Sequence, residues 1–361
     1  MPLKFVFGPS GSGKSTYLYQ HVIEESEKYP LKNFIVLVPE QFTMQTQKDL
    51  VSMHPRHGIM NIDVLSFARL AYRVFEETGT KQMQVLDDEG KNLILRKIAG
   101  DYENKLTVLK GNIKKLGYIS EVKSVISEFT QYDIGEEEMD EMLDHLDEDS
   151  RLYYKLKDIR LLYEGFQDYL RERYITKEEL LDVLNSQVKE SELLKNSVVV
   201  LDGFTGFTPV QNRLILELMR CCKEVWVTVT MDERENPYAY KHPYQLFGLS
   251  KQMVTTLVRM AGEDHIEVEE PVCLYGYPVK RFEKNQELAF LERNIFRYGS
   301  GRYDKAVENL EIHVAGNPRQ EADAVAEGIR RLVRKEQYRY RDIGVIVSDM
   351  NVYGDYLEQA F

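Results

Sequence analysis

The chain alternates short apolar runs with longer stretches in which apolar residues recur at helical spacing. The first three runs, at 4–7, 34–38 and 62–65, each precede a helical stretch, and the third helix is expected to end near Gly79. Apolar runs this short and continuous are typical of strands buried on both faces of a parallel sheet. Strand followed by helix, repeated, indicates an α/β fold in which helices cover a parallel sheet.

The pattern changes near residue 82, where a long, charged and helical segment begins. No strand signal interrupts this segment up to about residue 190, after which apolar runs return at 197–204 and 224–231 with a helix between them. We therefore expect one α/β domain that carries a large helical insertion. Residues 309–361 begin a strand–helix–strand unit that stops partway into its second helix, which favours a fragment of a longer protein.

These patterns divide the chain into four predicted segments. In order, they are the first part of the α/β domain, the helical insertion, the rest of the α/β domain with its connecting helices, and the start of a second α/β domain (1–81, 82–192, 193–305 and 306–361).

Composition fits a globular protein of this kind, with 43% hydrophobic and 29% charged residues. No apolar run approaches the roughly 20 residues that span a bilayer, and the N-terminal "MPLKFVF" leads straight into a glycine loop rather than a signal peptide. We expect no membrane association and a cytoplasmic location. The three cysteines, without metal-ligand spacing, are expected to be reduced core thiols (Cys221, Cys222 and Cys273).

The net charge of −12 argues against a uniformly basic nucleic-acid-binding protein. Residues 133–149 hold ten of the acids and no Lys or Arg, so the rest of the chain carries only −2. A local basic groove is therefore compatible with the sequence. We interpret the acidic run as a solvated helical face, with a docking surface as the alternative.

The N-terminal segment "FGPSGSGKST" has the spacing GxxxxGK[ST] between an apolar strand and a helix, the context that a phosphate-binding loop requires. Glycines allow backbone N–H groups to converge on phosphate oxygens, a lysine supplies a positive charge, and a serine hydroxyl can ligate Mg²⁺. We expect ATP and Mg²⁺ as cofactors, with Ser15 and Asp202 as the metal ligands. The expected nucleotide-binding residues are Gly8, Pro9, Ser10, Gly11, Ser12, Gly13, Lys14, Ser15 and Thr16.

Several classes of enzyme share this loop, and the rest of the chain separates them. Transporter ATPases need an LSGGQ-like signature, which is absent, and small nucleotide kinases carry an arginine-rich lid for which we find no clear candidate. The order of segments resembles superfamily 1 helicases of the UvrD type. "VLVPEQFT", "SFARLAYRVF" and "LDGFTGFTPVQ", together with the glycine loop, resemble the N-terminal part of the AddB family, the helicase-like and nuclease subunits of bacterial AddAB (RexAB-type) enzymes.

The resemblance implies a RecA-like P-loop domain with a helical insertion, followed by the start of a second RecA-like domain. It implies an AddA-type partner in a heterodimer, single-stranded and duplex DNA as ligands, and a role in double-strand-break repair by homologous recombination. Family members are ATP-dependent exodeoxyribonucleases whose inactive motor scans DNA for a recombination hotspot (Chi). Their nuclease domain and iron–sulfur cysteines lie toward the C-terminus, and no segment here matches them.

The chain departs from active helicases at the positions that hydrolyse ATP. Gly203 replaces the acid that normally follows Asp202, and Gly8 lies too near the N-terminus to leave room for an adenine-binding glutamine. Ser348 and Asp349 stand where an arginine is expected after the strand at 343–347. Loss of one such group costs roughly 10²–10³ in rate, so we expect nucleotide binding with negligible turnover and assign no catalytic residue.

Single strands are bound in such helicases by loops that follow the strands, through stacking aromatics and polar groups. Some of the aromatic candidates also fit core packing, and Gln41 is the residue we favour most. The expected DNA-binding residues are Gln41, Thr43, Phe67, Arg69, Tyr72, Phe204 and Phe207. Two alternatives stay open: a competent P-loop ATPase or kinase that acts on a small substrate, and a structural scaffold for the partner.

Overall fold

The computed structural model describes residues 2–79, 84–113, 115–170, 174–299 and 301–361. The chain forms two compact units, Met1–Lys284 and Asn285–Phe361. Each unit has buried hydrophobic residues of its own.

A six-stranded, entirely parallel sheet forms the centre of the first unit, as a RecA-like α/β fold requires. Its strand order is β3-β2-β6-β7-β1-β8, so β7 separates the strand of the glycine loop from the strand of Asp202. The expected fold class is therefore confirmed. The strands are β1 (Leu3–Gly8), β2 (Asn33–Leu37), β3 (Ile62–Leu65), β6 (Ser197–Leu201), β7 (Glu224–Thr230) and β8 (Val272–Cys273).

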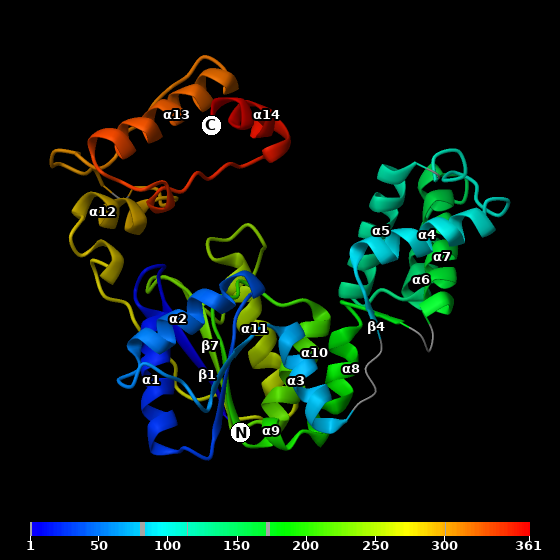
Figure 1. Ribbon diagram of the computed structural model, residues 1–361, viewed down its shortest axis with the longest axis horizontal. Helices are drawn as coiled ribbons and strands as arrows, with labels where there is room; N and C mark the ends of the chain where they lie inside the picture. Colours follow the sequence, from blue (N-terminus) through cyan, green and yellow to red (C-terminus); the bar gives the residue numbers. More distant parts are fainter. Residues whose placement is uncertain (1, 80–83, 114, 171–173, 300) are drawn as a thin grey trace. The chain divides into compact units, whose positions relative to one another are not determined.

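The apolar runs are continuous because alternate residues of each strand enter different cores on the two faces of the sheet. In β1, Leu3, Phe5 and Phe7 pack in one core while Val6 packs in the other. Figure 1 shows α1 and α2 on one side of the strands, and α3, α10 and α11 on the other. The helices are α1 (Lys14–Lys28), α2 (Thr43–Met53), α3 (Phe67–Thr78), α10 (Pro209–Cys221) and α11 (Gly248–Glu263).

Local capping signals set the limits of these helices. The Ser66 hydroxyl accepts a hydrogen bond from the Arg69 amide at the start of α3, and Gly79 ends that helix with a left-handed φ of 69°. This confirms the predicted end of α3. At the start of α10, Thr208 and Gln211 form a reciprocal capping box, and proline occupies the first helical turn.

The helical insertion has a hydrophobic core of its own, built from residues between Leu86 and Leu170. The absence of strands expected for this segment is wrong: two short parallel strands, β4 (Gln84–Leu86) and β5 (Tyr174–Thr176), pair at its two ends. A pair of this length gives too little periodicity to be recognised in sequence. The insertion helices are α4 (Asp88–Asp101), α5 (Leu116–Gln131), α6 (Glu136–Asp144) and α7 (Arg151–Leu170).

The helices that follow β5 belong to the α/β body rather than to the insertion core. Leu180, Leu184 and Leu194 pack with α3 and α10 in the main core. They lie in α8 (Leu180–Gln187) and α9 (Glu192–Lys195), with a short 3₁₀ turn, η2 (Val188–Glu190), between the two.

A buried carboxylate organises the irregular segment between α4 and α5. Asp158 of α7, only 2% exposed, accepts hydrogen bonds from the backbone amides of Thr107, Val108 and Leu109 at 2.8–3.0 Å. The Thr107 hydroxyl donates a further bond of 2.9 Å to the same carboxylate. Asp158 therefore satisfies successive backbone donors that would otherwise be left unpaired inside the protein.

A buried ion pair is expected to make the insertion sensitive to acid. Lys91, 2% exposed, donates hydrogen bonds of 2.7 and 2.9 Å to the two oxygens of Glu178. Burial raises the pKa of the Glu178 carboxyl, but the hydrogen bond and charge of Lys91 outweigh burial, so the pKa lies below its ordinary 4.5. The stabilisation is therefore present above pH 4.5 and lost as the pH falls through the lower folded-state pKa.

We expect thermal unfolding of the parent chain to move to lower temperature as the pH falls through this range. In a Lys91→Met/Glu178→Gln double variant the pair is gone, so its melting temperature is expected to change less over the same range. Melting curves by circular dichroism between about pH 6 and 3 measure this. Equal acid sensitivity in both chains would exclude the pair as its source.

Helices are the regular elements of the second unit. Its described residues form no strand at the start of the predicted strand–helix–strand unit (309–361) or at 343–347, where strands were expected. Ile312, Val314 and Ile346 in these segments are largely exposed, since no strand pairs with them in the described part of this unit. An isolated strand pair is marginal without further strands or a packed face. The helices are α12 (Gln286–Asn294), α13 (Pro318–Lys335) and α14 (Met350–Ala360).

Candidate functional site

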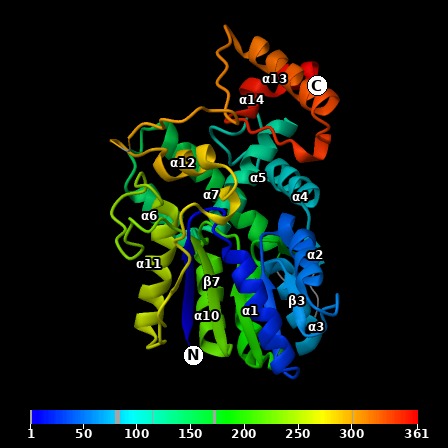
Figure 2. The same cartoon turned by 90° about the vertical axis from the view of Figure 1, so that its left-hand side faces the viewer.

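The loops that carry the candidate residues all follow the carboxyl ends of the parallel strands. Figure 2 shows the N-terminus at the lower end of the sheet, so these strand ends lie at its upper end. The glycine-rich loop (residues 8–15) follows β1, Gln41 follows β2, Ser66 follows β3 and Asp202 follows β6. Ligands of open α/β sheets bind at this edge.

The glycine-rich loop turns sharply between β1 and α1. Gly11 and Gly13 have φ angles of 84° and 94°, a region that only glycine enters without strain. The Lys14 ammonium donates hydrogen bonds to the carbonyls of Gly8 and Pro9 at 2.9 and 3.0 Å, which places the charge inside the loop. The loop therefore combines a left-handed glycine backbone with an enclosed positive charge.

The Ser12 hydroxyl belongs to the same loop. Its oxygen is buried and has no hydrogen-bond partner among the described residues. A buried polar atom without a partner costs free energy unless a water molecule or a ligand satisfies it. A phosphate oxygen held in this loop would accept the bond that Ser12 can donate.

Behind the loop, three hydroxyl groups converge on the buried carboxylate of Asp202. Ser15 and Thr228 donate to one oxygen at 3.1 and 2.6 Å, and Tyr19 donates to the other at 2.6 Å. Tyr19 also lies 3.4 Å from the Thr46 hydroxyl. The network joins α1, β6 and β7, so residues that lie far apart in the sequence form one site.

This donor set fits a magnesium ion. Mg²⁺ prefers hard oxygen ligands and is commonly held by one or two carboxylates together with substrate phosphates and water. Ser15 and Asp202 supply a hydroxyl and a carboxylate behind the glycine-rich loop. Within the described residues, no group of three or more His, Cys, Asp or Glu is placed to hold a metal, so the ion would depend on the nucleotide for its remaining ligands.

Tyr19 is held as a neutral hydroxyl in this network. Burial, with the Asp202 charge second, raises the pKa of the Tyr19 phenol far above its ordinary 10.0. The phenol therefore stays protonated and donates to Asp202 throughout the physiological pH range.

Gly203 does more than lack a carboxylate. Its φ of 80° lies in the left-handed region, and its amide donates a hydrogen bond of 3.3 Å to the Thr228 hydroxyl. A glutamate at this position would be strained, because side chains other than glycine rarely adopt this conformation. The backbone at position 203 therefore favours glycine over an acidic residue.

Two cations beside the glycine-rich loop were not found by sequence reasoning. Lys280 and Arg281 lie in a 3₁₀ turn, η3 (Lys280–Phe282), that follows β8. The Arg281 amide donates to the Gly11 carbonyl at 3.0 Å. The only sequence signal was a pair of basic residues soon after a very short strand, which matches no motif.

The expected DNA-binding residues divide into buried and exposed groups. Thr43 is buried and its hydroxyl donates to the Glu40 carbonyl at 3.0 Å, in the turn that begins α2. Phe67 is buried and packs against Phe204 and Phe207, with ring centroids 5.4 and 6.4 Å away. Phe67 belongs to the main core, and Phe204 and Phe207 are partly buried against it, so the three rings pack together.

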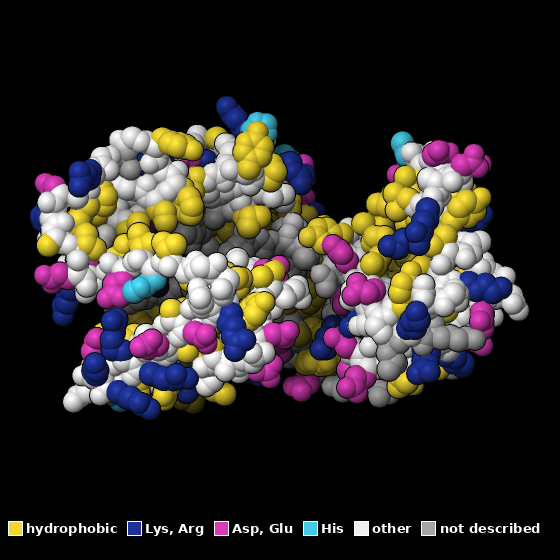
Figure 3. Space-filling view, turned by 90° about the horizontal axis from the view of Figure 1, so that it is seen from above, with side chains coloured by type: hydrophobic (Ala, Val, Ile, Leu, Met, Phe, Trp, Pro, Cys, Tyr) yellow, Lys and Arg dark blue, Asp and Glu magenta, His cyan; other side chains and the backbone are white. Residues whose placement is uncertain are grey.

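Gln41, Arg69 and Tyr72 are all exposed. Gln41 lies in a 3₁₀ turn, η1 (Glu40–Phe42), and the other two lie on α3. On the face drawn in Figure 3, basic and acidic side chains are interspersed, and the described residues form no continuous basic stripe there.

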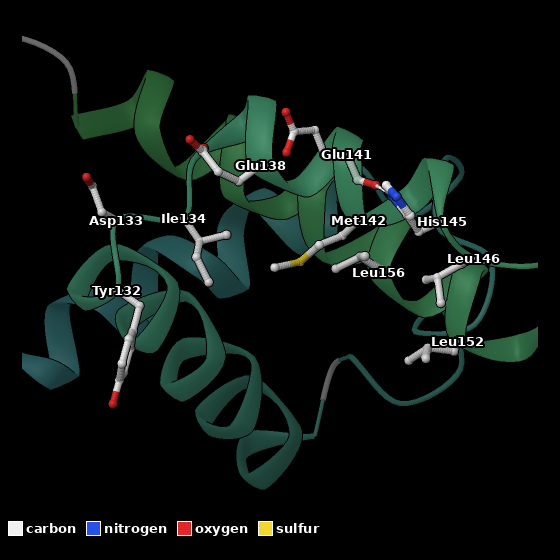
Figure 4. A pocket seen from close by; sticks show the side chains of 10 residues that line it. All are labelled: Tyr132, Asp133, Ile134, Glu138, Glu141, Met142, His145, Leu146, Leu152 and Leu156. Carbon is white, nitrogen blue, oxygen red and sulfur yellow. Dashed lines mark hydrogen bonds between the residues drawn. The ribbon is translucent and has the colours of Figure 1, made fainter. Parts of the chain in front are cut away.

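An apolar hollow lies in the helical insertion, away from the glycine-rich loop. Figure 4 shows apolar side chains pointing into it, with carboxylates of α6 at its rim. The run interpreted as a solvated face forms this rim, and most of its acidic side chains are exposed. The lining residues are Tyr132, Asp133, Ile134, Glu138, Glu141, Met142, His145, Leu146, Leu152 and Leu156.

The three cysteines are free thiols, and the expected core position is wrong for Cys273. Cys222 is fully buried, and burial raises the pKa of its thiol well above the ordinary 9.0. Burial likewise raises the pKa of Cys221. Cys273, by contrast, is exposed at the end of β8. In the described part of the chain, no helix is long and apolar enough to cross a membrane.

Comparison with known proteins gives one consistent result. Residues 5–292 match the family model described as "ADDB, N-terminal". A protein of Lachnoclostridium phytofermentans is 44% identical over 366 residues, which cover 99% of this chain and 32% of that protein. Proteins of Caldanaerobacter subterraneus subsp. tengcongensis and Clostridium kluyveri are 34% and 33% identical over the whole chain and 31% of their own length. All three are named as one subunit of an ATP-dependent helicase/deoxyribonuclease.

Proposed function

Because the chain belongs to the AddB N-terminal family, we propose that it is the nucleotide-binding and DNA-binding part of a helicase–nuclease subunit that binds ATP without hydrolysing it. The chain spans about a third of the length of the curated relatives it matches. For the whole protein, we propose that it processes double-strand breaks for recombination and assembles with an AddA-type partner. We also propose that the whole protein scans single-stranded DNA for a Chi-type sequence.

The observation that carries this proposal is the hydroxyl network around Asp202 together with Gly203. The carboxylate of Asp202 accepts hydrogen bonds from the hydroxyls of Ser15, Tyr19 and Thr228. The following residue, Gly203, has a left-handed backbone conformation. Ser15 and Asp202 supply the hydroxyl and the carboxylate that could hold Mg²⁺ beside a phosphate. No acidic side chain follows Asp202 to position an attacking water, which is a group that phosphoryl transfer ordinarily needs.

In this site, Lys14 would hold the terminal phosphates and Ser12 would donate a hydrogen bond to one phosphate oxygen. Ser15 and Asp202 would hold Mg²⁺, which neutralises phosphate charge when it is bound. Tyr19 and Thr228 orient the carboxylate. Together these groups fix a nucleotide in place and leave water unactivated, which suits a structural or switching role.

Strand binding at the neighbouring loops is the second part of the proposal. Gln41 offers both a donor and an acceptor to a base edge, and Arg69 offers a bidentate cation to a phosphate or guanine. Tyr72 presents an exposed aromatic face near Arg69 on α3. The three side chains follow adjacent strands, β2 and β3, at the edge that also carries the glycine-rich loop.

Anisotropy titration of labelled single-stranded oligonucleotides of varied sequence, at two salt concentrations, tests strand binding. We expect Gln41→Ala to remove sequence preference, and Arg69→Ala to reduce the slope of log affinity against log salt by about 1. Gln45→Ala and Arg73→Ala are the matched controls, since both side chains are exposed on the neighbouring helices. Binding that depends neither on the oligonucleotide sequence nor on any of the four substitutions would contradict sequence recognition by these loops.

Nucleotide turnover separates the remaining possibilities. Sustained MgATP hydrolysis without DNA would favour an active P-loop ATPase or kinase. Failure to bind either nucleotide or DNA, combined with tight binding of the partner subunit, would favour a scaffold. Binding of MgATP with negligible hydrolysis is the outcome that we expect.

A further inference from the structure

A segment far from the glycine-rich loop in sequence crosses directly over it. β8 pairs with β1 in parallel, Val6 opposite Val272 and Phe7 opposite Cys273. The Leu274 amide then donates to the Phe7 carbonyl at 2.8 Å, and the chain continues to η3 beside the loop. We call residues 274–282 the strap.

Arg281 of the strap lies on the crest of the loop. Its amide donates to the Gly11 carbonyl at 3.0 Å, and its guanidinium lies 3.5 Å from the Ser10 hydroxyl. A Cβ added to Gly11 would lie 2.7 Å from the Cβ of Arg281. Gly11 is therefore required both by its own backbone and by the approach of Arg281.

Lys280 approaches the other end of the loop. A Cβ added to Gly13 would lie 3.4 Å from the Cδ of the Lys280 side chain. Val279, the preceding residue, is only 3% exposed and anchors this end of the strap in the first unit. The two cations thus project from a fixed point onto the loop.

Neither Lys280 nor Arg281 forms an ion pair with an acidic side chain of the described residues, and both side chains are exposed. Lys14 adds a third positive charge within the same loop. Three cations so close to one another repel, and the repulsion is relieved when a polyanion binds among them. The arrangement suits a ligand with several phosphate charges.

We propose that Lys280 and Arg281 are phosphate ligands of the nucleotide site and make it select a triphosphate over a diphosphate. The inference rests on the proposed nucleotide-binding function and adds the residues that read the terminal phosphate. An arginine guanidinium forms paired hydrogen bonds to phosphate oxygens, which supports direct recognition. The loss of one phosphate removes the charge that the strap residues bind.

The strap also has a consequence for the chain that follows. The first compact unit ends at Lys284, directly after η3, so the residues that bind the terminal phosphate also lead into the second unit. Binding of a triphosphate therefore adds contacts to the strap at the junction. A diphosphate leaves the strap with fewer contacts.

Calorimetric titration of the full chain with MgATP and with MgADP tests the proposal. We expect Arg281→Ala to weaken MgATP binding by about 10- to 100-fold, the range for loss of a charged hydrogen-bonding group, and to change MgADP binding far less. Lys280→Ala is expected to act in the same direction. Arg259→Ala, which removes an exposed arginine of α11 paired with Glu263, is the matched control.

The failures of the two proposals are distinguishable. If the parent chain binds neither nucleotide, the proposed function falls and this inference falls with it. If the parent binds MgATP and Arg281→Ala binds it equally well, or weakens both nucleotides equally, only the inference is overturned. Hydrogen exchange adds a second readout: strap residues are expected to gain protection with MgATP and not with MgADP, and equal protection would contradict selection. Melting temperatures establish that each variant is folded.

Discussion

Replacing Lys14 by alanine is expected to weaken MgATP binding by about 100-fold, because the change removes the cation that lies inside the glycine-rich loop. The ammonium donates to the carbonyls of Gly8 and Pro9, so its position is fixed at the neck of the loop. The bound phosphate would exchange these carbonyl contacts for charged ones. Titration with a fluorescent ATP analogue in the presence of Mg²⁺ measures the loss.

Two further variants test whether the position and the shape of the Lys14 cation determine MgATP affinity. Lys28→Ala removes an exposed lysine at the other end of α1, where it pairs with Glu25, and is expected to leave affinity unchanged. Lys14→Arg keeps the charge but places a larger, planar group where a compact one is required, so it is expected to restore little binding. Parent-like affinity in Lys14→Ala would show that the loop holds no phosphate.

The largest effect on stability is expected from Asp158→Ala, at about 3–5 kcal/mol, because the change leaves buried donors without an acceptor. The backbone amides of Thr107, Val108 and Leu109 and the Thr107 hydroxyl all donate to this carboxylate. Asparagine offers one oxygen in place of two, so Asp158→Asn is expected to recover only part of the loss. Urea unfolding followed by circular dichroism gives the free energy.

The damage is expected to remain within the insertion. Residues 86–170 have their own core, which shares no buried residue with the core beneath the glycine-rich loop. Asp158→Ala is therefore expected to expose insertion amides to hydrogen exchange while MgATP binding persists. Asp101→Ala, an exposed carboxylate at the end of α4, serves as the control. Simultaneous loss of nucleotide binding would show that the two cores unfold as one.

Much of the α/β body could be predicted from the sequence because burial on both faces leaves continuous apolar runs. Ile62–Leu65 was expected at its observed limits, and Gly79 marked the end of α3. Ser15 and Asp202, which lie 187 positions apart, were expected in one site and are hydrogen-bonded. In each case a local residue type carries the information, whether a glycine, a cap or an apolar run.

Contacts that depend on the order of the strands in the sheet left no such signal in the sequence. Thr228 reaches Asp202 because β7 lies between β6 and β1, and Arg281 reaches Gly11 because β8 pairs with β1. Neither adjacency follows from spacing along the chain. The aromatic residues were ambiguous for a different reason, since helical spacing fits both a core face and a stacking surface. Phe67 lies in the core and Tyr72 is exposed, although both belong to α3.

The pairing of β4 with β5 has a consequence for how the insertion can vary. Gln84 lies opposite Tyr174 and Leu86 opposite Thr176, so the two ends of a long excursion are held side by side. Because this pairing already holds the two ends together, a change in the length of the insertion adds no loop-closure cost to the rest of the protein. The insertion is therefore a module whose two ends are paired with each other. We expect that its length and sequence can change, or that a short linker can replace it, while the strands of the nucleotide site keep their order.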